Sequence, residues 1–265
     1  MTIAIIGAGV MGEAVMAGLL DAGTPAADII VAERRLERVD ELNATYGVQC
    51  ASLVEAVSSA SIVFLVVKPQ DIEGVLEEIA PIVAAEALVI SLAAGITTSF
   101  IESKLPSSIA VARVMPNTPA LLKQGMSVVS PGAACSQEHV DRAVTLLGAI
   151  GKVAVVPESQ QDAVTAISGS GPAYVFYVAE AMFDAGLALG VEPDVTMELV
   201  LQTIYGAATM LRETGVLPEV LRQRVSSPNG TTVAAINTLD EHQVREAFAS
   251  AMLAAKNRSI ELGQK

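Results

Sequence analysis

Three glycines near the start of the chain have a spacing that suits dinucleotide binding. Gly7, Gly9 and Gly12 follow a short apolar run at residues 3–6 and precede a stretch with apolar residues at helical spacing. In a strand–turn–helix unit, the first glycine allows the tight turn, the second lets the backbone approach a pyrophosphate, and the third lets helix and strand pack closely. The phosphates would then lie over free N–H groups at the helix start. An ordinary glycine-rich turn is the alternative.

The residues after the second predicted strand, residues 29–32, bear on the choice of coenzyme. Glu33 suits a hydrogen bond to the ribose 2′-OH of NAD, whereas Arg34 and Arg35 could hold the 2′-phosphate of NADP. The two signals conflict, and solvated charges that open the next helix are an alternative for the arginines. The balance favours NADP slightly, with NAD also possible.

Polar residues also follow two further predicted strands. Lys68 follows the buried run at residues 61–67 and precedes a proline that fixes the turn, while Asn117 and Thr118 lie in a proline-flanked loop. Because ligands bind beyond the carboxyl ends of parallel strands, these residues lie at the ligand edge of the predicted sheet. A coenzyme or active-site role is therefore favoured for Lys68, and a purely structural turn is a fair alternative for Asn117 and Thr118.

The C-terminal half lacks an obvious catalytic base. No Lys, Arg or His occurs between Lys152 and Arg212, and the two histidines, His139 and His242, have surroundings typical of solvated side chains. An enzyme that oxidises an alcohol usually needs a base to take the hydroxyl proton. An imine is itself basic and can arrive protonated, so a neutral hydroxyl hydrogen bond to its nitrogen could suffice. The missing base favours imine reduction.

Two hydroxyl-bearing loops could form such a neutral site. Residues 168–174 place hydroxyl groups and glycines at the start of the helix expected at residues 172–189. Residues 226–232 do so at the start of the helix expected at residues 231–239. The backbone N–H groups and the helix dipole of the second loop would form a carboxylate site without any cation. Helix capping by Ser and Thr is the alternative for either loop alone.

The order of the predicted elements gives the fold class. Strands alternating with helices predict an α/β, doubly wound parallel sheet of the Rossmann type, followed by an all-helical domain. The expected domains are residues 1–157, which bind the dinucleotide, and residues 158–265, which bind substrate and dimerise. The expected strands are residues 3–6, 29–32, 61–67, 87–91, 109–114, 127–130 and 153–156. The expected C-terminal helices are residues 159–167, 172–189, 195–213, 219–224, 231–239 and 243–262.

Composition narrows the function classes. The net charge of −13 argues against a nucleic-acid or anionic-membrane partner. Apolar residues make up 52% of the chain, so we expect part of its surface to be buried in an oligomer. Cys50 and Cys135 lack metal-site spacing and indicate free thiols in a reducing cytoplasm, with no metal site. With no secretory signal or transmembrane segment in the sequence, we expect a cytoplasmic protein.

At its two hydroxyl-bearing loops the sequence closely resembles pyrroline-5-carboxylate reductase, and the match spans nearly the whole chain. The runs that carry the resemblance are residues 7–12, 67–70, 113–119, 168–174 and 227–232. The resemblance implies hydride transfer from NAD(P)H to the ring carbon of 1-pyrroline-5-carboxylate, which gives L-proline in the last step of proline synthesis. It also implies a helical domain that interlocks in a homodimer, and dimers that assemble further, often into decamers.

The resemblance also implies roles for individual residues. Thr232 would be the catalytic hydroxyl that meets the imine nitrogen, and the backbone of Gly230 and Thr231 would receive the substrate carboxylate. The nicotinamide and substrate pocket would be lined by Ser168, Met115 and Pro116. The coenzyme would be bound by Gly7, Gly9, Val10, Met11, Gly12, Arg34, Arg35, Val67, Lys68, Pro69 and Asn117. A partner chain would complete each site.

One position departs from the family pattern. Asn229 stands where the family usually has the first of two glycines. Asn is the non-glycine residue that best tolerates positive φ, so the loop conformation can be kept. A reductase of another cyclic imine or of a 2-ketoacid is the alternative enzyme, and a non-catalytic dinucleotide-binding regulator is the alternative from another class.

Overall fold

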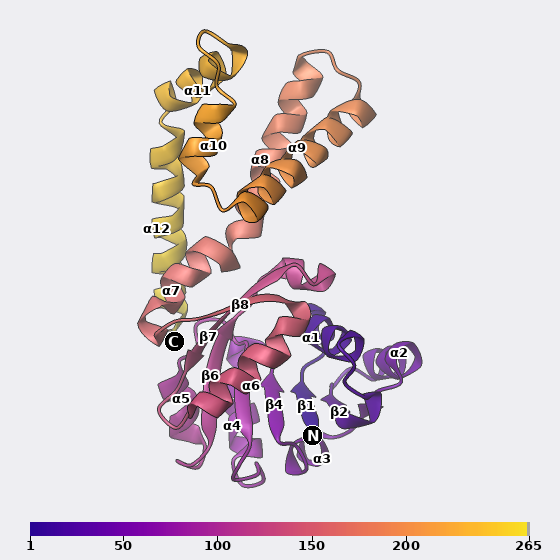
Figure 1. Ribbon diagram of the computed structural model, residues 1–265. Helices are drawn as coiled ribbons and strands as arrows, with labels where there is room; N and C mark the ends of the chain where they lie inside the picture. Colours follow the sequence, from indigo (N-terminus) through magenta and orange to yellow (C-terminus); the bar gives the residue numbers. More distant parts are fainter. Residues whose placement is uncertain (264–265) are drawn as a thin grey trace. The chain divides into compact units, whose positions relative to one another are not determined.

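The computed structural model describes residues 1–263, which form two compact units (Figure 1). The first unit holds residues 1–170 together with residues 255–263, and the second holds residues 171–254. The first is an α/β unit built on one sheet, and the second is entirely helical. The predicted succession of an α/β part and a helical part is confirmed.

The sheet of the first unit has eight strands in the order β3-β2-β1-β4-β5-β6-β7-β8. They are β1 (Ile3–Ile6), β2 (Ile29–Ala32), β3 (Gln49–Cys50), β4 (Ile62–Leu65), β5 (Leu88–Ser91), β6 (Ala110–Met115), β7 (Gly125–Pro131) and β8 (Gly151–Val155). Neighbours pair in parallel except β6 and β7, which are antiparallel. A parallel return needs a long crossover, and β6 is joined to β7 only by residues 116–124, so β7 reverses. The sequence did not predict this reversal.

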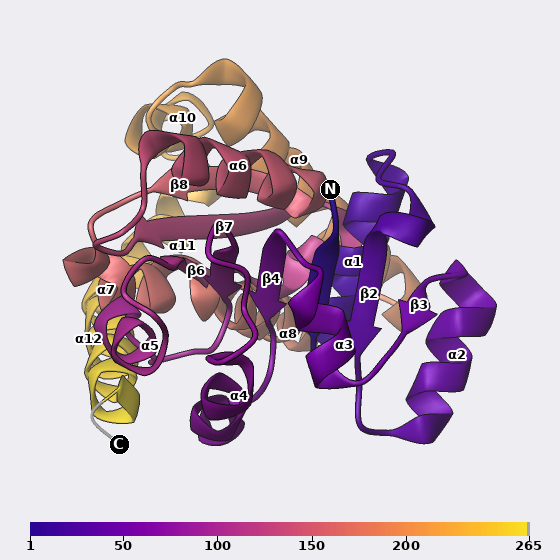
Figure 2. The same cartoon turned by 90° about the horizontal axis from the view of Figure 1, so that it is seen from below.

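Alternate residues along each strand build two separate cores, one on each face of the sheet. Ile3 and Ile5 pack on one face, whereas Ala4 and Ile6 pack on the other. The first face is covered by α1 (Val10–Asp21), α2 (Leu36–Tyr46) and α6 (Gln137–Leu147) (Figure 2). The second face is covered by α3 (Leu53–Ser58), α4 (Ile72–Ile79) and α5 (Thr98–Lys104). Burial on both faces explains why these strands are almost uninterrupted apolar runs.

Several short elements escaped the sequence analysis. They are β3, α3 and α5, together with the 3₁₀ turns η1 (Ala26–Asp28), η2 (Pro69–Asp71) and η3 (Thr118–Leu122). Each is shorter than the window that hydrophobic periodicity needs. Two further 3₁₀ turns, η4 (Gly148–Ile150) and η5 (Glu158–Gln160), lie where the sequence predicts α-helix. The helix expected at residues 159–167 is divided into η5, α7 (Gln161–Val164) and a π-helical turn, η6 (Thr165–Gly169).

Residues 158–170 remain part of the sheet-containing unit. Gln161 is fully buried, and its Nε2 donates hydrogen bonds to the Val128 carbonyl at 3.1 Å and to Ser130 Oγ at 2.8 Å, both on β7. This side chain ties α7 to the sheet. The expected domain boundary at residue 157 therefore marks the end of the strands, whereas the compact unit continues to Ser170.

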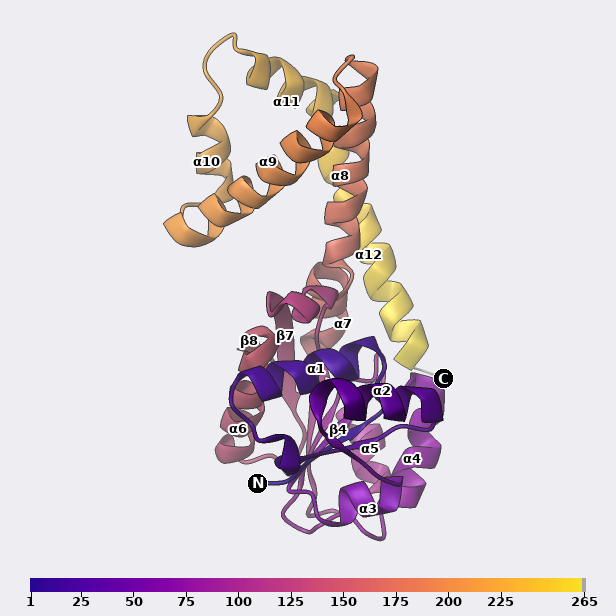
Figure 3. The same cartoon turned by 90° about the vertical axis from the view of Figure 1, so that its right-hand side faces the viewer.

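The second unit consists of helices of different lengths (Figure 3). They are α8 (Gly171–Ala188), α9 (Pro193–Thr214), α10 (Pro218–Arg224), α11 (Thr231–Glu241) and the start of α12 (Val244–Gly263). Although α8 is largely apolar, none of its residues is buried within a single chain, and Phe176 and Tyr177 are exposed. An apolar helix that its own chain leaves uncovered is typical of a subunit interface. Across residues 1–263, the helices are too short or too polar to span a bilayer.

A partly buried ion pair fixes β6, the strand that leads into Met115, Pro116 and Asn117. Arg113 is 6% exposed, and its Nη1 lies 3.2 Å from Glu158 Oε1. The same carboxylate accepts a hydrogen bond from the Thr98 N–H at 2.7 Å. Glu158 thus joins β6, α5 and the segment after β8.

We expect Glu158→Gln to lower the free energy of unfolding by about 2–3 kcal/mol, because it leaves Arg113 buried without its nearest countercharge. Urea unfolding at a fixed protein concentration measures the change.

Glu138→Gln is the matched control. Its carboxylate pairs with Arg142 at 2.9 Å on the exposed side of α6, and such surface pairs contribute about 0.5 kcal/mol. Equal decreases in the free energy of unfolding in the two variants would contradict the stabilising role proposed for the Arg113–Glu158 ion pair.

Candidate active site

A groove with a volume of about 1140 Å³ lies at the carboxyl ends of β1, β2 and β4. It brings together six of the residues expected to bind coenzyme: Gly7, Gly9, Arg34, Arg35, Val67 and Lys68. Helix α1 begins with Val10 and Met11, directly after the groove-lining Gly9. The turn η2 begins with Pro69, directly after the groove-lining Lys68. This is the edge at which ligands bind in open α/β sheets.

The glycine loop has the geometry that pyrophosphate binding requires. Gly7 has φ +91°, and a Cβ on Gly12 would lie 2.1 Å from the Gly7 carbonyl oxygen, so the start of α1 touches the loop. A Cβ on Gly9 would meet nothing within 4 Å. Gly9 is also the N-cap of α1 and offers no side-chain cap, which leaves N–H groups of the first turn available to phosphate. These residues fit a dinucleotide coenzyme.

Glu33 is held by the chain itself at the end of β2. Its side chain is 8% exposed, and its carboxylate accepts hydrogen bonds from the backbone N–H groups of Ala8, Arg34 and Arg35 at 3.0–3.1 Å and from the Arg35 guanidinium. Burial by itself would raise the pKa of Glu33, but the bonds from Arg35 and Ala8 outweigh it and lower the pKa from 4.5 to about 2. Glu33 is therefore ionised at neutral pH.

Three arginines near the groove have different surroundings. The side chain of Arg34 is 79% exposed and lies 3.8 Å from Asp71, while that of Arg35 is 64% exposed and pairs with Glu33. Arg38, which the sequence analysis did not select, is nearly buried, and its Nε donates to the Ala8 carbonyl at 3.1 Å. Its Nη2 pairs with Glu13 on α1. Arg38 therefore anchors the glycine loop to α2, although nothing in the sequence distinguishes it from a solvated helix residue.

A second group of expected residues gathers around the π-helical turn. Asn117 Nδ2 donates to the Ser168 carbonyl at 3.0 Å, and Asn117 Oδ1 accepts from the Met126 N–H at 2.8 Å. A Cβ on Gly169 would lie 2.5 Å from Met115 Cε, which places Met115 against the same turn. π-Helical turns are common at functional sites. The Asn117 amide holds this turn in place.

The remaining expected residues begin α11 in the second unit. Asn229 has φ +58°, which confirms that Asn keeps the left-handed conformation here. The Gly230 N–H donates to the Ser227 carbonyl at 3.0 Å, and Gly230 provides no side-chain cap for α11. The N–H groups of Thr231 and Thr232 therefore remain as donors. Thr232 is half-buried, and its hydroxyl makes no hydrogen bond to any residue that the structure describes.

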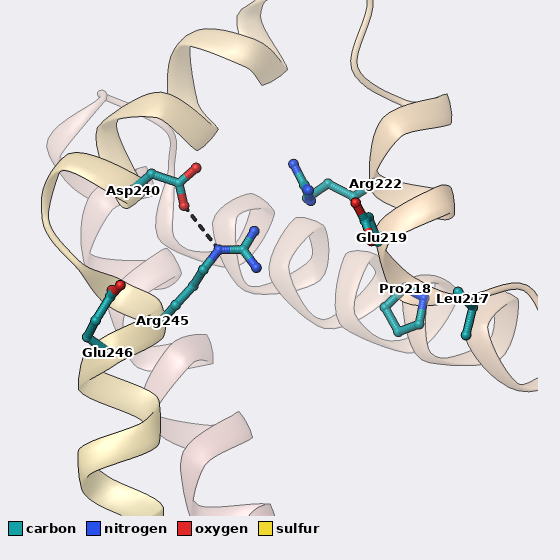
Figure 4. A pocket seen from close by; sticks show the side chains of 7 residues that line it. All are labelled: Leu217, Pro218, Glu219, Arg222, Asp240, Arg245 and Glu246. Carbon is teal, nitrogen blue, oxygen red and sulfur yellow. Dashed lines mark hydrogen bonds and ion pairs between the residues drawn. The ribbon is translucent and has the colours of Figure 1, made fainter.

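A further hollow of about 940 Å³ occurs in the second unit (Figure 4). It is lined by Leu217, Pro218, Glu219, Arg222, Asp240, Arg245 and Glu246. Arg245 Nε donates a hydrogen bond to Asp240 Oδ1 at 3.2 Å. One of the two guanidinium groups that line the hollow is therefore already paired. The lining contains three carboxylates against two guanidinium groups and none of the expected site residues. Its charge does not suit an anionic substrate.

Residues 1–263 contain no group of three or more His, Cys, Asp or Glu side chains that could hold a metal ion. Cys50 and Cys135 are free thiols in this chain. Cys135 Sγ donates to the Val111 carbonyl at 3.0 Å, and burial raises its pKa.

Comparisons with known proteins agree with this arrangement. A family model described as pyrroline-5-carboxylate reductase dimerisation matches residues 158–262, and one described as NADP oxidoreductase coenzyme F420-dependent matches residues 2–95. The pyrroline-5-carboxylate reductase of Corynebacterium melassecola is 44% identical over 99% of both chains. That of Pseudomonas aeruginosa is 42% identical over 99% of this chain and 97% of its own.

Solved structures show the same relationship. The pyrroline-5-carboxylate reductase of Coxiella burnetii has a TM-score of 0.94 and 36% identity, covering 100% of this chain and 99% of its own. The NADP-bound pyrroline carboxylate reductase of Plasmodium falciparum has a TM-score of 0.89 and 26% identity, covering 99% of this chain and 98% of its own. The two curated relatives are more than 40% identical to this chain along essentially its whole length. The chain therefore belongs to the pyrroline-5-carboxylate reductase family.

Proposed function

We propose that this protein catalyses the NAD(P)H-dependent reduction of 1-pyrroline-5-carboxylate to L-proline, the last step of proline biosynthesis. The observation that carries the proposal is the full-length similarity to reductases of that name. The absence of Lys, Arg and His between Lys152 and Arg212 supports it, because reduction of a basic imine does not need a strong protein base.

The first unit would hold the coenzyme, which supplies the hydride. The pyrophosphate would lie against Gly7, Gly9 and the N–H groups of Val10, Met11 and Gly12. Arg34, Arg35, Val67, Lys68 and Pro69 would line the rest of the coenzyme site. Met115, Pro116 and Ser168 would line the nicotinamide and substrate pocket, and Asn117 would position the Ser168 turn through its two hydrogen bonds.

The start of α11 would hold the substrate. The resemblance assigns the carboxylate to the backbone of Gly230 and Thr231. Because the Gly230 N–H donates to the Ser227 carbonyl at 3.0 Å, the N–H groups of Thr231 and Thr232, with the helix dipole, would receive the carboxylate instead, while Gly230 shapes the turn. The Thr232 hydroxyl oxygen would accept a hydrogen bond from the N–H of the protonated imine and orient the ring. Hydride addition to the carbon of a protonated imine gives the neutral amine, so no proton has to leave the protein in that step.

We further propose that the protein works as a cytoplasmic homodimer that assembles into a decamer, with a partner chain completing each site. The uncovered apolar surface of α8 supports the dimer, because burial of such a surface is favourable. The match of residues 158–262 to a dimerisation family supports the same role for the helical region.

The direct test is a turnover assay with purified protein, 1-pyrroline-5-carboxylate, and NADH or NADPH. We expect coenzyme oxidation with L-proline as the product, followed by absorbance and by amino-acid analysis. Coenzyme binding without turnover would overturn the proposed function and leave the family and fold intact.

Thr232→Ala is expected to lower kcat by about tenfold to a hundredfold, since a hydrogen bond made to the reacting group is lost. The dissociation constant for coenzyme should not change, and Thr232→Ser should restore turnover.

Thr238→Ala is the control, because Thr238 lies on the same helix and only bonds the Ala234 carbonyl. Equal losses of turnover and coenzyme affinity in Thr232→Ala would contradict the assigned role.

Two glycine substitutions separate coenzyme contact from folding. Gly9→Ala adds a methyl group to open space, so the protein should fold normally and lose coenzyme affinity by at least about tenfold. Gly12→Ala forces a contact with the Gly7 carbonyl and should cost about 2–4 kcal/mol of stability. Fluorescence titration with NADPH or NADH and thermal unfolding measure the two effects. Undiminished coenzyme affinity in Gly9→Ala would contradict the proposed pyrophosphate position.

A further inference from the structure

At the end of β2, the Glu33 carboxylate accepts hydrogen bonds from N–H groups that could otherwise bind an anionic ligand. The consecutive backbone N–H groups of Arg34 and Arg35 both point at Glu33 Oε1, at 3.0 and 3.1 Å. Successive N–H groups of this kind form a concave site that favours negative charge. The Arg35 guanidinium adds bonds from Nε at 3.0 Å and Nη2 at 3.2 Å. The donors best placed for a phosphate are therefore already satisfied.

Glu33 lies where the adenosine ribose is expected. It directly follows β2 and lines the same groove as Gly7 and Gly9. In doubly wound sheets an acidic residue at this place bonds the ribose 2′-OH, whereas an arginine nearby accommodates a 2′-phosphate. The sequence contains both kinds of residue, and the contacts decide between them.

We propose that Glu33 makes NADH the preferred coenzyme of this protein, because its carboxylate occupies the donors and the space that the 2′-phosphate of NADPH would need. The inference rests on the proposed function only in that a nicotinamide coenzyme binds in the groove.

The anchoring of Glu33 shows why the carboxylate does not move aside. Its side chain is 8% exposed, and Oε2 also accepts the Ala8 N–H at 3.1 Å, so displacing it would break its hydrogen bonds to three backbone donors. Arg35 is 64% exposed by comparison, and its guanidinium can be replaced at Oε2 by a neutral ribose hydroxyl. A 2′-phosphate would instead bring nearly two negative charges against a fixed carboxylate.

The test measures coenzyme binding in the absence of substrate. Dissociation constants for NADH and NADPH are determined by fluorescence titration on one preparation of the full-length protein at fixed ionic strength. We expect NADH to bind at least about tenfold more tightly than NADPH, a ratio that corresponds to one charge-assisted hydrogen bond. Glu33→Ser should shift the ratio towards NADPH by about tenfold or more, because it opens the Arg34–Arg35 donors to phosphate.

Glu37→Ser is the matched control. It removes the same charge four residues further on, from an exposed position on α2 that does not line the groove, and should leave the ratio unchanged. If Glu33→Ser binds neither coenzyme, the ratio of the NADH and NADPH dissociation constants of Glu33→Gln tests the inference instead. Thermal unfolding shows whether both variants fold.

Tighter binding of NADPH by the unmodified protein, or an unchanged ratio in the Glu33 variants, would overturn the inference. A protein that prefers NADH but does not reduce 1-pyrroline-5-carboxylate would overturn the proposed function alone.

Discussion

The close approach of α1 to the loop after β1 is the constraint on which the coenzyme groove depends. At Gly7 and Gly12 no Cβ can be accommodated without moving the backbone, and between them the backbone of Ala8 is held through both its N–H and its carbonyl group. Glu33 accepts the Ala8 N–H, and Arg38 donates to the Ala8 carbonyl. The loop that faces the phosphates is therefore held by backbone contact and by two charged side chains from the next βα unit, and its N–H groups are preorganised.

The elements that the sequence predicts well are those whose apolar residues form a continuous run or recur at a regular period. Strands β1, β2, β4, β5 and β6 are continuous apolar runs because both faces of the sheet are covered, and the long C-terminal helices show helical periodicity. The reversal of β7 depends on the length and path of one connection, and the two-residue strand β3 has no period to detect. Long-range polar contacts such as Arg113 with Glu158, and Gln161 with β7, leave no local pattern.

In the candidate site too, local features follow from the sequence, whereas contacts between distant residues do not. The spacing of the glycines predicts the coenzyme loop, and the known tolerance of Asn for positive φ predicts the turn at Asn229. The hydrogen-bond partner of a side chain depends on residues that are distant in the sequence, so a local pattern does not predict it. Asn117 was expected beside the coenzyme, and the sequence did not predict that its amide also holds the Ser168 turn against the start of β7. Arg35 was a candidate phosphate ligand, and Glu33 already occupies its guanidinium.

The charge balance of the chain makes these local arrangements necessary. With a net charge of −13, the protein cannot attract anions through a broad basic surface. Backbone N–H groups at helix starts hold negative charge without adding a side-chain cation, and both α1 and α11 begin with glycine N-caps that leave such groups uncapped. An acidic chain that binds anions in this way depends on turn geometry for affinity. At the end of β2, Glu33 already pairs with the Arg35 guanidinium, so this cation beside the groove is not free for an anionic ligand.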